Sequence, residues 1–244
     1  MRQASGRFGG SITTSGARVT QALVVINVVL YIIELAHSQL GFDWEMVGFG
    51  RFPGGPFIGV GAGQWYRLIT SAFLPPAASG GLGLLDIAFN MWALLIVGPA
   101  VEKVLGAGRY LTVYLISALG GSVLVYLLVP FEQAAGASGA IFGLFGAWFV
   151  LARRLGLDYR LIVTLIVLNL ILSFSWHAIA WQAHVGGLIA GGLLTAAYAY
   201  APRKNRTAIQ VGATVAMLVI IAIGVIIGNH LILGTYSFYQ GRLF

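Results

Sequence analysis

Seven long apolar segments run through this chain of 244 residues, and they restrict it to folds that lie inside a bilayer. Each is close to the ~20 residues that a helix needs to cross the hydrocarbon core. Hydrophobic residues make up 59% of the chain and charged residues only 9%, too few to cover a soluble domain. We therefore expect an all-α polytopic membrane protein, with spans near residues 19–36, 82–101, 109–129, 136–152, 160–175, 180–200 and 208–228.

The basic residues predict the orientation of these spans. With a cytoplasmic N-terminus, most of the 14 Lys and Arg residues fall on the inner side, and only Arg51, Arg67 and Arg242 fall outside. Such an excess on the inner side is the rule for membrane proteins. With seven spans, the C-terminus then lies outside. We expect the membrane to be a bacterial plasma membrane. The net charge of +7 follows from this topology and gives no reason to invoke nucleic acid as a partner.

Three polar side chains fall at one depth in three different spans. At about 1.5 Å per helical residue, Asn90, Ser138 and His184 lie about 18, 22 and 28 Å above the inner charges of their own spans. All three then lie in the outer half of a ~30 Å hydrocarbon core. We therefore expect the three helices to bring these side chains together.

A serine and a histidine that meet in this way could form a hydrolase. Ser138 needs a base within hydrogen-bond reach, and His184 is the best candidate because an imidazole ordinarily titrates near neutrality. The Ser138 amide, at the start of a helix, and the Asn90 side chain could together hold an oxyanion. Phe142, one turn after Ser138, could pack against the imidazole in place of a third, acidic member. Gly136, just before the serine, would support the site.

Each of these features also has a simpler interpretation. Gly136-Ala137-Ser138-Gly139 alone is more often a packing face of small residues, and Gly187-x-x-x-Gly191 is also typical of helix packing. Asn90 alone more often joins two helices by a hydrogen bond. Glu102 and Lys103, at the inner end of the second span, are interpreted as an interfacial charge pair. The joint occurrence of the polar residues at one depth is what favours a site.

Other chemistries are less compatible with the sequence. The chain has no cysteine, which excludes thiol catalysis and disulfides. We expect no metal site, because His184 has no second ligand at helical spacing, and the proposed chemistry requires no cofactor. A transporter would be expected to carry buried charge along a pathway or paired broken helices, and neither is evident here.

The two small-residue motifs resemble the signatures of a known family. Gly136-Ala-Ser138-Gly139 and Ala183-His184-x-x-Gly187-x-x-x-Gly191 are similar to those of the rhomboid intramembrane serine proteases. Trp65-Tyr66-Arg67 resembles the Trp-Arg element of that family, and Asn90 and Glu102 match positions of its second span. The resemblance covers about residues 60–200. It implies a Ser-His dyad that cleaves transmembrane segments of single-span or polytopic membrane proteins near the outer face of the bilayer.

The resemblance and the composition together predict how the chain is organised. Residues 1–18, rich in Gly, Ser and Thr, are expected to form a flexible cytoplasmic tail. Residues 19–200 would form a rhomboid-like six-helix core, with a long outer loop at 37–81. Residues 201–244 would supply a linker, a seventh C-terminal transmembrane helix like that of some family members, and a short outer tail. The sequence leaves the oligomeric state open.

One position departs from the family pattern. The second-span motif of rhomboids is typically His-x-x-x-Asn, and this chain has Asp86-Ile-Ala-Phe-Asn90. A carboxylate would repel a developing oxyanion, and one lost oxyanion donor can cost about 100-fold or more in rate. We therefore expect an enzyme that is slower, or more dependent on pH, than members with the histidine. The alternative is a catalytically weak or silent rhomboid-like protein that binds membrane clients.

Overall fold

The computed structural model describes residues 16–37, 39–51, 55–74, 82–176 and 179–240 of the chain. Within these residues, every apolar segment predicted from the sequence forms a long helix. The long helices are α1 (Arg18–Ala36), α4 (Leu82–Leu105), α5 (Ala107–Leu128), α6 (Ser138–Leu155), α7 (Arg160–Ser175), α8 (Trp181–Tyr200) and α9 (Arg206–Gln240). This arrangement confirms the all-α polytopic fold.

Five segments of the described part are long and apolar enough to cross a membrane: Arg18–Ala36, Gly83–Leu105, Ala107–Leu128, Ser138–Leu155 and Arg203–Ile232. Helix α7 is apolar but shorter, with 16 residues. Helix α8 carries Gln182, His184 and several glycines, which lower its hydropathy. Spanning by α7 and α8 therefore stays a prediction.

Close backbone contacts among α5, α6 and α8 form the centre of the bundle. A Cβ atom on Gly191 of α8 would lie 2.5 Å from the carbonyl oxygen of Gly143 in α6. A Cβ on Gly120 of α5 would lie 2.6 Å from the Cβ of Ala190 in α8. Glycine is needed at such positions because small residues let membrane helices approach closely. The packing interpretation of the Gly187-x-x-x-Gly191 spacing is thus confirmed for this part of the chain.

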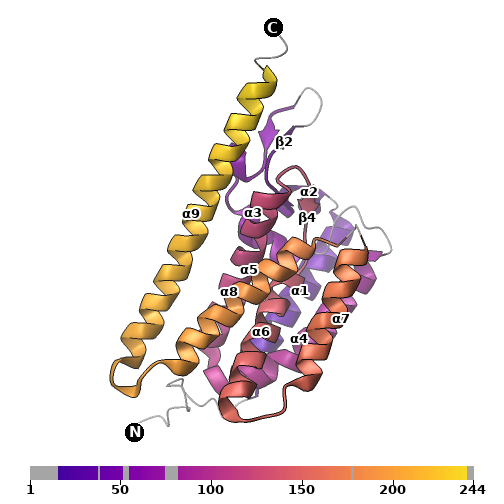
Figure 1. Cartoon of the computed structure of the whole chain (residues 1–244). Coiled ribbons are helices and arrows are strands. Elements are labelled where there is room, and N and C mark those ends of the chain that lie inside the picture. Colours follow the sequence, from indigo (N-terminus) through magenta and orange to yellow (C-terminus); the bar gives the residue numbers. More distant parts are fainter. Residues whose placement is uncertain (1–15, 38, 52–54, 75–81, 177–178, 241–244) are drawn as a thin grey trace.

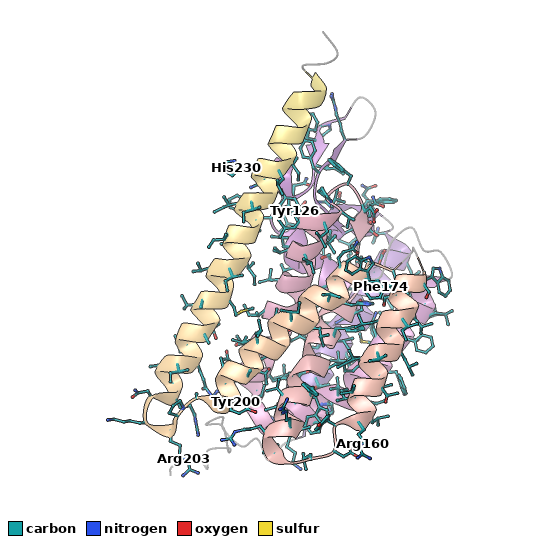
Figure 2. All side chains as sticks on the ribbon, viewed as in Figure 1. Tyr126, Arg160, Phe174, Tyr200, Arg203 and His230 are labelled. Atoms are coloured by element: carbon teal, nitrogen blue, oxygen red, sulfur yellow. The ribbon has the colours of Figure 1, made fainter. Side chains whose placement is uncertain are left out.

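Helix α9 lies along α5 and α8 and extends past the other helices at one end of the bundle (Figure 1). Its 35 residues correspond to about 52 Å of helix, which exceeds the ~30 Å hydrocarbon core. The predicted span near 208–228 lies inside this helix, but the segment expected to be an outer tail is helical as far as Gln240. Arg160 and Arg203 lie at the opposite end of the bundle (Figure 2).

Glu102 at the end of α4 fixes the start of α1. Its carboxylate accepts hydrogen bonds from the backbone N–H groups of Val19 (3.0 Å) and Thr20 (2.9 Å) and from the Thr20 hydroxyl (2.8 Å). The first-turn N–H groups of a helix have no acceptor within the helix, and an anion is favourable there. Glu102 is buried and Lys103 is exposed, so the predicted charge pair between them is wrong.

Between α1 and α4, the described residues 39–51 and 55–74 form a cap over one end of the bundle (Figure 1). It contains α2 (Gln39–Trp44), β1 (Met46–Val47), β2 (Gly50–Arg51), β3 (Phe57–Ile58), α3 (Arg67–Thr70) and 3₁₀ turns at Val60–Ala62 and Ser71–Phe73. β2 pairs with β3, and β1 pairs antiparallel with β4 (Gln133–Ala134). The second pairing ties the cap to the chain just before α6.

Arg67 holds this cap together from its interior. Its Nε donates to Gln64 Oε1 (2.7 Å), and its Nη1 donates to the backbone oxygens of Phe42 (2.8 Å) and Glu45 (2.9 Å). The side chain is buried, so each of these bonds replaces water that the guanidinium has lost. The arginine of the Trp65-Tyr66-Arg67 motif therefore has a structural role here, whereas Trp65 and Tyr66 are exposed.

Candidate active site

Ser138 is the first residue of α6, and the turn before it depends on Gly136. Gly136 has φ 122°, in the region that side chains other than glycine rarely adopt. Its N–H donates to the backbone oxygen of Ser71 (2.9 Å), which anchors the turn to the cap. As predicted, Ser138 therefore stands at a helix start, where backbone N–H groups lack acceptors within the helix.

The structure brings His184 to Ser138. His184 lies in the first turn of α8, and its Nε2 is 2.8 Å from Ser138 Oγ. Its ring stacks on Phe142, with ring centroids 4.2 Å apart and an angle of 7° between the planes. The predicted contact of Phe142 with the imidazole is therefore present. His184 is only 7% exposed, whereas Ser138 is half-buried, so the imidazole lies in the interior of the bundle and the serine lies nearer its surface.

The crossing of α6 and α8 explains why the two side chains meet. A Cβ on Gly139, the residue after Ser138, would lie 3.1 Å from the carbonyl oxygen of Ala183, the residue before His184. The backbones of both helices thus come together beside the serine and the histidine. Small residues at this crossing set the distance between the two functional groups, so packing and candidate chemistry use the same motif.

Asn90 and Asp86 of α4 lie beside Gly136. Asn90 Nδ2 donates to Asp86 Oδ2 (3.0 Å), one helical turn away. A Cβ atom placed on Gly136 would be 3.5 Å from Asp86 Oδ2, 3.7 Å from Ser138 Oγ and 3.9 Å from Asn90 Nδ2. The three side chains therefore surround one point, as the depths of Asn90 and Ser138 predicted. Asp86 shares this point with the candidate oxyanion donors.

A small cavity adjoins the site on the side of the cap. Its volume is about 20 Å³, and its lining includes Ser71, Ser122, Gly136, Gly139 and Ala183. Such a volume can hold one water molecule when polar partners are present, and the hydroxyl oxygens of Ser71 and Ser122, 3.5 Å apart, supply them. Hydrolysis needs water beside the nucleophile, and this cavity lies next to the residues that flank Ser138.

The sequence interpretation missed Ser173 of α7. Its Oγ is 2.7 Å from His184 Nδ1, the ring nitrogen that faces away from Ser138, and it donates to the backbone oxygen of Asn169 (2.6 Å). A serine inside an apolar helix often bonds the carbonyl four residues before it, so the residue type alone carried no functional signal. Only the packing of α7 on α8 reveals the contact.

The chain is similar in sequence to known proteins. A family model described as the Rhomboid domain matches residues 62–202. The rhomboid protease GluP of Bacillus subtilis is 37% identical over 146 residues, which are 57% of this chain but only 27% of GluP. YdcA of the same bacterium is 37% identical over 166 residues, or 66% of this chain and 77% of YdcA.

The chain belongs to the rhomboid family. A more distant relative is the rhomboid protease AarA of Providencia stuartii, 26% identical over 220 residues, 78% of this chain and 75% of AarA. Membership of the family, together with the apolar helices, makes this rhomboid an integral membrane protein. Among the described residues, no three His, Asp or Glu side chains form a group that could hold a metal ion.

Proposed function

We propose that this rhomboid is an intramembrane serine endopeptidase, with Ser138 as nucleophile and His184 as general base. The observation that carries the proposal is the 2.8 Å contact between Ser138 Oγ and His184 Nε2, with the imidazole held against Phe142. A serine hydroxyl is a weak nucleophile until a base within hydrogen-bond reach can take its proton. The names of the relatives GluP and AarA, both rhomboid proteases, agree with this chemistry.

In the proposed reaction, Ser138 Oγ attacks the carbonyl carbon of a peptide bond while His184 Nε2 takes the hydroxyl proton. The carbonyl oxygen becomes an oxyanion, to which the Ser138 backbone N–H and Asn90 Nδ2 donate. The C–N bond then breaks, and His184 gives its proton to the leaving amine. Water attacks the acyl-serine with His184 again as base, which releases the second product and restores the serine.

Asp86 is expected to slow this reaction. An amide NH₂ group has two hydrogens, and Asp86 accepts one of those on Asn90, which leaves the other for the oxyanion. The same carboxylate, when ionised, lies close enough to repel the developing negative charge. We therefore infer an active enzyme that is slower, or more dependent on pH, than rhomboids with a histidine at this position.

The substrates we propose are transmembrane segments of single-span or polytopic membrane proteins, cut near the outer face of the bilayer. We further propose an N-terminus inside and a C-terminus outside, in a bacterial plasma membrane, because the basic residues favour the inner side. Asp86 is the one observation that favours the alternative, a weak or silent rhomboid-like protein that binds membrane clients.

A cleavage assay in liposomes separates the two functions. The purified protein is reconstituted with a set of single-span proteins whose outer halves differ in Gly and Pro content, beside Ser138→Ala and His184→Ala variants. A protease produces fragments cut within a transmembrane segment in the wild type alone. Binding of the same proteins to wild type and variants, without fragments from either, would support the silent binder instead.

A further inference from the structure

The two ring nitrogens of His184 make different hydrogen bonds, and their directions can be derived. The backbone oxygen of Asn169 can only accept, so the single hydroxyl hydrogen of Ser173 is directed to it over 2.6 Å. The Ser173 oxygen then has only lone pairs to offer to His184 Nδ1, 2.7 Å away. Nδ1 must therefore carry the ring proton of a neutral imidazole, which leaves Nε2 as the acceptor that faces Ser138.

We infer that Ser173 is a positioning residue, whose oxygen accepts the Nδ1–H of His184 and thereby holds the imidazole in the tautomer that can deprotonate Ser138. The inference rests on the proposed function for its consequence in catalysis, but the tautomer itself can be measured without activity. In many serine hydrolases an acidic residue orients the base in this way. Here a neutral hydroxyl on a different helix does so.

The apolar surroundings of the contact make His184 Nδ1–H depend on the Ser173 oxygen as its acceptor. Ser173 is only 3% exposed, and one face of the imidazole is covered by Phe142, which offers no lone pair. Without the hydroxyl, an Nδ1–H in this apolar site would lose its partner. The other tautomer, which has its proton on Nε2 and donates it to Ser138 Oγ, would then become favourable. In that tautomer Nε2 cannot take the proton of Ser138.

The contact also links the candidate base to α7. Ser173 lies on α7, His184 on α8 and Ser138 on α6, so one chain of hydrogen bonds crosses three helices. The ring centroids of Phe174 and Trp181 lie 4.9 Å apart, and this contact connects the C-terminal end of α7 to the N-terminal end of α8. Phe174 is at the end of α7 that faces away from Arg160 (Figure 2). Displacement of this end of α7 would remove the acceptor from Nδ1.

A matched pair of substitutions tests the role of the hydroxyl. Ser173→Thr keeps a hydroxyl that bonds the carbonyl four residues back in a helix, whereas Ser173→Val has the same shape without it. The first readout is the rate at which a fluorophosphonate probe labels the protein. A neutral hydrogen bond of about 0.5–1.5 kcal/mol corresponds to a rate ratio of about 2–13. We expect Ser173→Val to react slower by that factor and Ser173→Thr to stay within about twofold of wild type.

The second readout is the tautomer of His184, from ¹⁵N NMR of histidine-labelled protein in lipid, with His184→Ala used to assign the signals. We expect a proton on Nδ1 in the wild type and in Ser173→Thr, and a shift of the proton toward Nε2 in Ser173→Val. In a wild type that is labelled, equal labelling rates of the two variants would overturn the inference, and so would a proton on Nε2 in the wild type. A wild type that is never labelled but has its proton on Nδ1 would refute the proposed function and leave the role of Ser173 standing.

Discussion

A wider spacing of the central helices where they cross should lower the cleavage rate strongly and the free energy of unfolding only moderately. A Cβ on Gly121 of α5 would lie 2.7 Å from the carbonyl oxygen of Ala183, which directly precedes His184. Ordinary contacts of this kind begin near 3.4 Å, so Gly121→Ala must move α5 and the start of α8 apart by about 0.7 Å. Overpacking of this kind costs about 1–3 kcal/mol in the free energy of unfolding.

The effect on catalysis should be larger, because the displaced residue is the neighbour of the base. A misplacement of about 1 Å at a catalytic group can cost about 100-fold, so we expect a fall in cleavage rate of about tenfold or more. Gly146→Ala is the matched control: its Cβ would lie 2.7 Å from the carbonyl oxygen of Leu188, and Gly146 is about two helical turns from Ser138. It should lose similar stability and less activity.

The assay combines the thermal unfolding midpoint in detergent with the cleavage rate of the same preparation in liposomes. Gly212→Ala serves as the neutral variant, because a Cβ there has no neighbour within 4 Å. It should keep full activity and gain up to about 1 kcal/mol from the better helix propensity of alanine. A Gly121→Ala variant that lost stability but cleaved at the wild-type rate would contradict this effect, and so would a Gly146→Ala variant that lost as much activity as Gly121→Ala.

Substitutions at three further positions test the site and the helix packing around it. Asp86→His removes the carboxylate and restores a donor, so the cleavage rate should rise, by up to about 100-fold, with a changed pH profile; an unchanged rate and profile would contradict the repulsion argument. Phe142→Leu removes the ring under His184, and the loss of an aromatic pair of about 0.5–1.5 kcal/mol should slow probe labelling by about 2–13-fold, while Phe142→Tyr should be nearly neutral. Glu102→Gln removes the negative charge at the start of α1 and should lower the free energy of unfolding by about 1–2 kcal/mol, measured from the thermal midpoint. The rate of probe labelling per folded molecule should stay unchanged. A lowered labelling rate would show that this end of the bundle is coupled to the site.

The parts of the structure that follow from local sequence were predictable. The long helices coincide with the apolar segments because a helix in a bilayer must satisfy all its backbone groups internally. The stack of Phe142 on His184 follows from the spacing of one helical turn between Phe142 and Ser138. The hydrogen bond between Asp86 and Asn90 has the same spacing of one helical turn, so it was equally accessible from the sequence.

The contacts that were missed depend on which helices are neighbours. Glu102 binds the start of α1, more than 80 positions away in the chain, and no local pattern distinguishes this from a pair with Lys103. The contact of Ser173 with His184 likewise requires the packing of α7 against α8. The extension of α9 to Gln240 was missed because residues beyond 228 are less apolar, which marks the end of a span but not the end of a helix.

Covalent labelling with a fluorophosphonate, followed by peptide mapping, measures whether His184 activates Ser138. The detergent-purified wild type is compared with Ser138→Ala and His184→Ala, all three checked for equal folding by thermal unfolding. We expect one modified residue, Ser138, in the wild type and no labelling of either variant. A folded wild type without label, or label that persists in His184→Ala at the wild-type rate, would contradict it.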